Sequence, residues 1–358
     1  TSDYLTAAMS QEFCFACPRP LDQQETIQLA HGGGGRLMQR LIEGLFVPAF
    51  AGGAPRGPLH DSSVVEVREG RLAFTTDTFV VDPIFFPGGD IGKLAVCGTV
   101  NDLAMSGAVA RWLSAGFILE EGFPIESLCR VVESMQRTAA AAGVQIITGD
   151  TKVVDRGKGD GVFINTAGIG LVAPGIEISP DRVRPGDAVL VSGDLGRHGI
   201  AIMSVREGLQ FEGALDSDCD CLGELVSAIC ARGAAVHCLR DLTPGGLAAA
   251  LNEIATAAAV GIEIDESAVP VAPQVAGACE ILGLDPLYVP NEGRLVAMVA
   301  ADAAAAILEI MRAHPAAPQP ALVGKVTDTH PGGVELRGGL GGRRILDLLS
   351  GEQMPRIC

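Results

Sequence analysis

The sequence predicts a mixed α/β protein with two domains. At 358 residues the chain is longer than one hydrophobic core usually supports. Segments with the spacing of amphipathic helices alternate with short apolar runs that are typical of strands, and proline and glycine cluster at 174–180. We therefore expect an N-terminal extension, two domains and a tail, at residues 1–25, 26–175, 176–346 and 347–358.

Hydrophobic spacing assigns the elements of the first domain in chain order. Leucines at four-residue steps predict a helix that follows a run of glycines, and an alternating pattern around Glu69-Gly70 predicts a hairpin. The expected elements are a helix at 36–46, hairpin strands at 63–67 and 71–76, a helix at 93–105, a strand at 112–119, a helix at 125–142 and a strand at 144–148.

The second domain shows the same mixture of patterns. We expect strands at 188–192 and 294–299 and helices at 200–207, 221–232 and 245–259. The last residues, 350–358, have no periodicity and predict a mobile tail.

Composition excludes several classes of protein. The net charge is −17 and the chain has only four lysines, so nucleic acid is not an expected partner. The sequence has no run of 18 apolar residues, so no membrane span is expected. The N-terminus lacks the pattern of a secretory signal. Cysteines on apolar helical faces, such as Cys97, Cys129 and Cys230, are typical of reduced core thiols. These observations predict a cytoplasmic protein.

Four short acidic motifs lie at expected turns, and their carboxylates are Asp61, Asp77, Asp102 and Asp150. One such aspartate is more typical of a helix cap or a turn. Several that converge would supply the hard oxygen ligands that Mg²⁺ needs to hold ATP. Four glycines precede the first expected helix: Gly32, Gly33, Gly34 and Gly35. They could bring backbone N–H groups close to phosphates, or they could form a flexible joint, and the sequence favours neither interpretation.

Two further side chains could carry chemistry. Cys358 is a thiol at the end of the chain, where it adds nothing to a core, and a tail of about ten residues reaches roughly 30 Å. A terminal thiol on a tail of this reach predicts a carrier arm. Lys152 could neutralise phosphate or act as a base, although an isolated lysine is more often a surface residue. Cys14 and Cys17 form a CxxC without the second pair that a zinc site requires.

Several of these motifs together resemble one family. They are the glycine run after His31, TDTFVVDP at 76–83, FFPGGDIGKLA at 85–95, NDLA at 101–104, TGDTKVV at 148–154 and the ending PRIC at 355–358. From about residue 26 to its end, the chain is similar to the HypE family of [NiFe]-hydrogenase maturation proteins. This family lies in the PurM-like superfamily of aminoimidazole ribonucleotide synthetase and selenophosphate synthetase.

The resemblance implies an activity and its partners. A HypF-type carbamoyltransferase would load carbamoyl onto Cys358, ATP would activate the amide oxygen, and loss of phosphate would leave a thiocyanate. An iron scaffold complex of the HypC–HypD type would then accept the cyanide for the hydrogenase active site. The implied fold is two PurM-like domains, with the N-terminal sheet paired in a homodimer and ATP near the glycine loop.

The resemblance also carries residue roles onto this sequence. The Mg–ATP carboxylates fall on Asp61, Asp77, Asp102 and Asp241, and proton handling falls on Lys152 and Glu292. Asp82 and Asp150 are further candidates nearby.

Two positions depart from the family pattern, and two other functions stay open. Pro244 stands where relatives more often have arginine, and the N-terminal extension with its CxxC has no family role. A selenophosphate synthetase-like kinase would share the carboxylates, but it would have a reactive cysteine at the glycine loop, which this chain lacks. A non-catalytic thiol or metal carrier would use Cys358 with Cys14 and Cys17.

Overall fold

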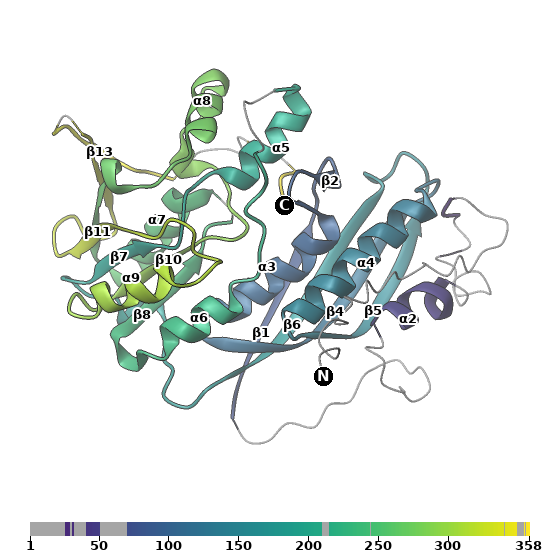
Figure 1. Cartoon of the computed structure of the whole chain (residues 1–358), viewed down its shortest axis with the longest axis horizontal. Coiled ribbons are helices and arrows are strands. Elements are labelled where there is room, and N and C mark those ends of the chain that lie inside the picture. The colour runs from purple at the N-terminus through teal and green to yellow at the C-terminus, as the bar shows by residue number, and fades with distance from the viewer. Residues whose placement is uncertain are drawn as a thin grey trace, which may run out of the picture.

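The structure is a computed structural model that describes residues 26–28, 31, 41–50, 70–209, 215–243, 245–339, 341–348, 354 and 356–358. The described part of the chain forms two sheet-and-helix units (Figure 1). None of its helices is both long enough and apolar enough to cross a membrane. The expectations for 36–40, for the first hairpin strand, for the glycine run and for the CxxC lie outside the described residues.

The N-terminal unit is built on a four-stranded sheet with the order β1-β6-β4-β5. Its neighbours run antiparallel except β4 and β5, which are parallel because helix α4 connects them. Helices α3 and α4 cover one face of this sheet (Figure 1). The bounds are η2 Ile42–Phe46 (a π-helix), α2 Val47–Phe50, β1 Arg71–Phe79, β2 Phe85–Phe86, β3 Gly89–Asp90, α3 Ile91–Met105, β4 Ala108–Glu120, α4 Ile125–Ala141, β5 Gln145–Val154 and β6 Val162–Val172.

Helix α3 is the central element of the molecule. Asp90 caps its first turn by accepting hydrogen bonds from the backbone N–H groups of Gly92 and Lys93, at 2.8 and 3.1 Å. Almost all of its residues are buried, because the sheet, α4 and the second unit pack on different sides of it. A helix that is apolar all round needs such surroundings.

The C-terminal unit has a seven-stranded sheet with the order β13-β12-β9-β11-β7-β10-β8. Only β12 and β9 run parallel among these described pairs. Its elements are η3 Pro180–Arg182, β7 Ala188–Val191, α5 Arg197–Glu207, α6 Gly223–Cys230, η4 Gly233–Ala235, β8 Val236–Asp241, α7 Gly246–Ala258, β9 Gly261–Asp265, η5 Glu266–Ala268, α8 Pro273–Leu282, η6 Pro286–Tyr288, β10 Leu295–Val299, α9 Ala304–Arg312, β11 Ala321–Thr327, β12 Val334–Arg337 and β13 Arg343–Ile345.

The two units meet along α3. Ala104 and Met105, at the end of this helix, share a buried cluster with Leu222 and Leu225 of the second unit. One helical turn earlier, the side chain of Asn101 donates to the backbone carbonyls of Asp220 and Glu292, at 3.0 and 3.1 Å. The unit boundary is therefore held by both apolar packing and buried hydrogen bonds.

The predicted mixed α/β class is confirmed. The helices expected at 93–105 and 125–142 correspond to α3 and α4, and the strand expected at 112–119 lies within β4. One expectation about the cysteines was wrong: Cys129 is disulfide-bonded, whereas Cys97 and Cys230 are free thiols.

Candidate active site

A pocket of about 420 Å³ opens where β1, α3, β8 and the last residue of the chain come together. β1 supplies four residues, α3 two, and the end of β8 with the following turn three. The pocket is lined by Thr76, Asp77, Thr78, Phe79, Asp102, Met105, Arg240, Asp241, Thr243 and Cys358. In Figure 1 the C-terminus lies beside β2, between α5 and α3.

Three carboxylates from different elements share this pocket. Burial raises the pKa of Asp102 to about 7, with further increases from the charges of Asp241 and Asp77. A hydrogen bond that the Thr75 hydroxyl donates to Asp102 Oδ2, at 3.0 Å, acts in the opposite direction. The pKa of Asp241 is likewise raised, by burial first and also by Asp77. Confined carboxylates that raise each other's pKa are stabilised by a cation between them.

The donor set fits Mg²⁺ bound together with a phosphate compound. No group of three acidic, histidine or cysteine side chains within the described ranges could hold a metal ion by itself. Mg²⁺ usually takes one or two carboxylates and completes its shell with water and phosphate oxygens. Thr76, Thr78 and Arg240 line the same pocket and add hydroxyl and guanidinium donors that suit phosphate.

The chain end is packed against the protein in this structure. Ile357 and Met354 are buried in a core cluster that contains residues of the N-terminal unit and of α5 and α8 in the second unit. The carbonyl of Ile357 lies 2.8 Å from His198 Nε2, so this nitrogen carries the proton, and His198 Nδ1 lies 2.8 Å from the Ser217 hydroxyl. The guanidinium of Arg206 donates to the backbone carbonyls of Asp82 and Arg356.

These contacts place Cys358 at the pocket wall next to Glu292. Burial raises the pKa of Cys358 well above its ordinary value, and the nearby charges of Glu292 and Asp77 add to this shift. Glu292 itself is buried, with 2% of its surface exposed, and its pKa is also raised well above the usual range, first by burial. Apart from its interaction with the Cys358 thiol, neither of its carboxyl oxygens has a hydrogen-bond partner among the described residues. A buried carboxyl with so few partners is unusual unless it has a chemical role.

The structure does not bring all the candidate residues to this pocket. Lys152 and Asp150 lie on the edge strand β5, where they form an exposed ion pair at 3.1 Å. Asp82 faces the tail: its backbone N–H donates to the carbonyl of Arg356 at 3.2 Å, and its carboxylate lies 3.7 Å from the Arg356 guanidinium. The candidates Asp61, Gly32, Gly33, Gly34 and Gly35 lie outside the described residues, as does Pro244.

Sequence reasoning missed the polar residues that flank the aspartates and those that hold the tail. Thr76 and Thr78 flank Asp77 directly, and Arg240 and Thr243 flank Asp241, so adjacency to a candidate carboxylate was an available signal. His198 and Arg206 gave none, because their contacts with the tail span more than a hundred residues of sequence.

Comparisons with known proteins agree with this architecture. Two family descriptions match, "AIR synthase related protein, N-terminal domain" at residues 59–172 and its C-terminal counterpart at 184–337. The chain is 52% identical to the carbamoyl dehydratase HypE of Rhodobacter capsulatus over 338 residues, which are 94% of this chain and 99% of that protein. The chain belongs to the HypE family. The Escherichia coli K12 HypE is 50% identical, with 93% and 99% covered.

Solved HypE structures share the fold. A HypE in complex with ATP matches with a TM-score of 0.89 and 47% identity, and the match covers 93% of this chain and all of that one. A chain of a HypE–HypF complex matches with a TM-score of 0.76 at 47% identity, with 78% and 90% covered. The family predicted from the motifs is therefore confirmed, and with it the PurM-like fold.

Proposed function

We propose that this chain dehydrates an S-carbamoyl group on its own Cys358 to a thiocyanate and uses ATP to do so, in the maturation of a [NiFe] hydrogenase. One observation carries the proposal: Cys358 lies at the wall of the pocket that holds the three carboxylates, with the buried carboxyl of Glu292 beside it. The relatives named carbamoyl dehydratase support the reaction. The selenophosphate synthetase-like kinase and the metal carrier give no reason for this placement of the tail.

The pocket residues suit the two difficulties of this reaction. An amide oxygen is a poor leaving group, and phosphorylation by ATP makes it a good one. The two N–H protons must also leave, and a buried carboxylate with a raised pKa is a stronger base than an exposed one. Glu292 is this base in our proposal, because its buried carboxyl lies next to the Cys358 thiol and is hydrogen-bonded by no other described residue.

Asp77, Asp102 and Asp241 would hold Mg²⁺ and ATP. The ion would neutralise phosphate charge, and the HypE structure with ATP supports nucleotide binding in this fold. Asp61, Asp150, the glycines 32–35 and Lys152 stay in the proposal as further nucleotide or proton-handling residues. Asp82 acts on the tail, through the backbone and side chain of Arg356.

The carrier-arm proposal requires the tail to leave the pocket. A HypF-type carbamoyltransferase would load Cys358, as the HypE–HypF complex of a relative supports, and a HypC–HypD-type scaffold would take the cyanide onto iron. The contacts of His198 and Arg206 describe the docked position of this arm. We place the cycle in the cytoplasm, where ATP and Mg²⁺ are available.

The test is to weigh the protein after reaction. With ATP, Mg²⁺, carbamoyl phosphate and the carbamoyltransferase, the C-terminal peptide should gain a carbamoyl group and then lose the mass of one water only when ATP is present. Glu292→Gln should accumulate the carbamoyl form and slow its dehydration by about 10²–10⁴-fold. Cys230→Ser, which changes a free thiol in another cluster, is the matched control. An unmodified Cys358 alongside a reacting control homologue would overturn the proposal.

A further inference from the structure

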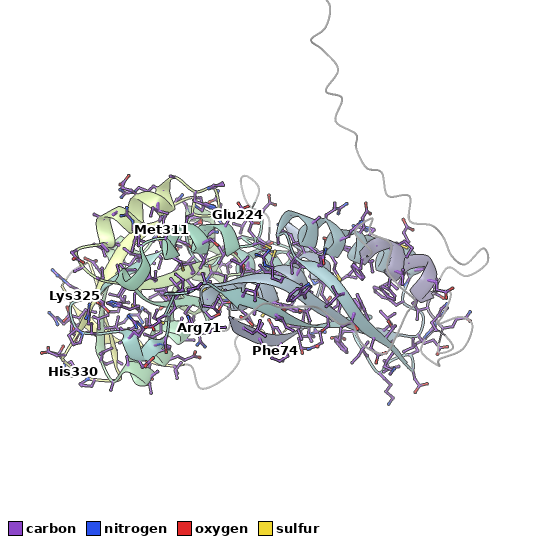
Figure 2. All side chains as sticks on the ribbon, turned by 90° about the horizontal axis from the view of Figure 1, so that it is seen from below. Arg71, Phe74, Glu224, Met311, Lys325 and His330 are labelled. Carbon is purple, nitrogen blue, oxygen red and sulfur yellow. The ribbon has the colours of Figure 1, made fainter. Side chains whose placement is uncertain are left out.

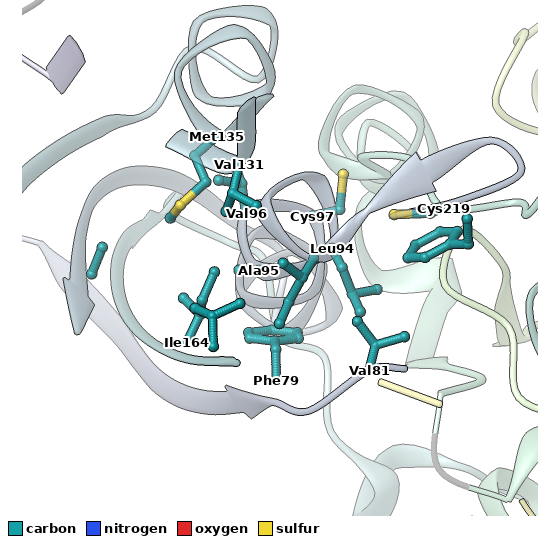
Figure 3. Packing of buried hydrophobic residues seen from close by; sticks show 14 of the residues in the cluster. Phe79, Val81, Leu94, Ala95, Val96, Cys97, Val131, Met135, Ile164 and Cys219 are labelled. Atoms are coloured by element: carbon teal, nitrogen blue, oxygen red, sulfur yellow. The ribbon is translucent and has the colours of Figure 1, made fainter. Parts of the chain in front are cut away.

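Three thiols meet where α3 contacts the second unit, and none of them lines the pocket of the candidate active site. Cys97 projects from α3, and Cys219 and Cys221 come from the segment that precedes α6. The sulfur atoms of Cys97 and Cys221 lie 3.1 Å apart. Cys219 also interacts with Cys97, and Figure 3 shows the sulfur of Cys219 directed toward Cys97. All three are free thiols, and the proposed function uses none of them.

The backbone around these thiols is fixed by other contacts. Asn101, one turn after Cys97, accepts a hydrogen bond from the N–H of Leu222 at 2.7 Å and donates to the carbonyl of Asp220. These two residues flank Cys221. The helix and the segment therefore stay together whether or not a covalent bond joins the sulfurs, and little chain entropy remains to be lost when such a bond forms.

Exposure distinguishes the members of the cluster. Cys97 and Cys219 are buried, whereas Cys221 is half-buried and is the one that a small solute can reach. The neighbouring thiols Cys219 and Cys221, together with burial, raise the pKa of Cys97 well above its ordinary value. Cys97 therefore stays protonated, and Cys221 is the thiol that an oxidant meets first.

We propose that Cys97 and Cys221 are an oxidisable pair that closes a disulfide between the two units when the protein meets a peroxide. Hydrogen peroxide first oxidises Cys221 to a sulfenic acid and leaves as water. The sulfur of Cys97 then attacks the sulfur of Cys221: the S–S bond forms, the S–O bond breaks, and the hydroxyl leaves as water with the Cys97 proton. The two thiols together give two electrons to one peroxide, and a dithiol reductant reverses the reaction.

The disulfide would have a measurable mechanical effect. Its partners are 124 positions apart in sequence, so the closed loop is long and the unfolded chain is strongly constrained. The S–S bond of ~2.0 Å also requires the sulfurs to approach by about 1 Å. This movement would occur beside Glu292, whose backbone carbonyl Asn101 also binds. The oxidised protein should unfold at a melting temperature several degrees higher, and dithiothreitol should abolish the increase.

The experiment treats the full-length protein with hydrogen peroxide, blocks the remaining thiols under denaturing conditions, and maps disulfides by mass spectrometry without reduction. We expect one cross-linked peptide pair that appears only after peroxide treatment, Cys97 with Cys221, in addition to the disulfide of Cys129, and no Cys97–Cys221 pair in Cys221→Ser. Because Cys221 is half-buried, this variant should fold, whereas Cys97→Ser could disturb the core. Cys238→Ser, at a buried free thiol of the second unit, is the control that should keep the pair and the temperature shift.

Two results would overturn the proposal. One is a Cys97–Cys219 bridge that persists in Cys221→Ser, which would assign the pair differently. The other is a Cys97 that remains open to alkylation while Cys221 or Cys358 is oxidised. Neither result bears on the dehydratase reaction, which is assayed under reducing conditions with the mass of the C-terminal peptide.

Discussion

Asp102 shows how a binding residue destabilises the empty protein. Its folded pKa of about 7 lies above the unfolded value of about 3.9, so the folded protein holds the proton more tightly. The contribution of this raised pKa to the free energy of unfolding is fully present when the pH is below the unfolded pKa. It is lost as the pH rises through the folded pKa. Above pH 7 the ionised carboxylate opposes folding until a cation binds.

We therefore expect Asp102→Asn to stabilise the ligand-free protein at pH 8 while it impairs nucleotide binding. The gain should be about 1–2 kcal/mol, because solvent in the open pocket screens part of the effect, and it should fade toward pH 4. Affinity for Mg–ATP should fall at least about tenfold. Thermal unfolding at both pH values and calorimetric titration measure these effects.

The matched control for Asp102→Asn is Asp302→Asn, an exposed aspartate just before α9. It should change neither stability nor affinity. If Asp102→Asn were less stable than the parent at pH 8, the electrostatic explanation would be wrong.

At the scale of the element, the docked tail depends on few polar contacts. Arg206 donates to the carbonyls of both Asp82 and Arg356, and so ties the tail to the segment before β2. Arg206→Ala should expose Cys358 and speed its alkylation by maleimide about three- to tenfold, as expected for the loss of hydrogen bonds from a charged donor. Mass spectrometry of the C-terminal peptide over time measures this rate.

Arg312→Ala is the comparison for the tail experiment, because Arg312 on α9 is paired with Glu309 and is far from the tail in the fold. Its alkylation rate should equal that of the parent. Equal rates in Arg206→Ala would show that the other contacts hold the tail without Arg206, namely the hydrogen bond between His198 and the Ile357 carbonyl and the packing of Met354 and Ile357.

Helix α3 lies close to the backbone of α4 at Gly92. A Cβ atom there would lie 2.3 Å from the carbonyl oxygen of Val131, so Gly92→Ala must separate the two helices. We expect a loss of about 1–3 kcal/mol in the free energy of unfolding, measured by urea denaturation. Gly277→Ala on α8 is the reverse case, since nothing lies within 4 Å of its Cβ position. It should stabilise the protein by about 0.5–1 kcal/mol.

How far the sequence predicts this structure also depends on scale. Local spacing identified α3 and α4, because helix periodicity is visible within the helix itself. The hairpin predicted between 63–67 and 71–76 stays a prediction, because its first strand lies outside the described residues. The pairing of β1 with β6 was not predicted, since such distant pairing leaves no local pattern. The motifs named Asp77, Asp102 and Asp241 but could not show that one pocket joins them, since they come from separate elements.

At the scale of the whole molecule, the N-terminal sheet has an open apolar face. Along β1 the residues that alternate with the partly buried ones are exposed, as Leu72 is by 54% and Phe74 by 71%. Val109 and Ile118 on β4 are exposed by 45% and 44%. Phe74 lies at the molecular surface in Figure 2. Register places Phe74 opposite Ile169, which itself pairs with Trp112, so the apolar face is continuous across three strands. Such a face is typical of an interface.

We propose that this face pairs two copies of the chain, as the family resemblance implied. Phe74→Asp should convert the dimer to a monomer, with an increase of at least about tenfold in the dissociation constant, because the charge would be buried at the centre of the interface. Analytical ultracentrifugation measures this change. Ile281→Asp, on α8 and exposed by 73%, alters an equally accessible apolar side chain away from the sheet and should leave the dimer intact. A parent protein that sediments as a monomer, or an Ile281→Asp variant that dissociates in place of Phe74→Asp, would exclude this face as the interface.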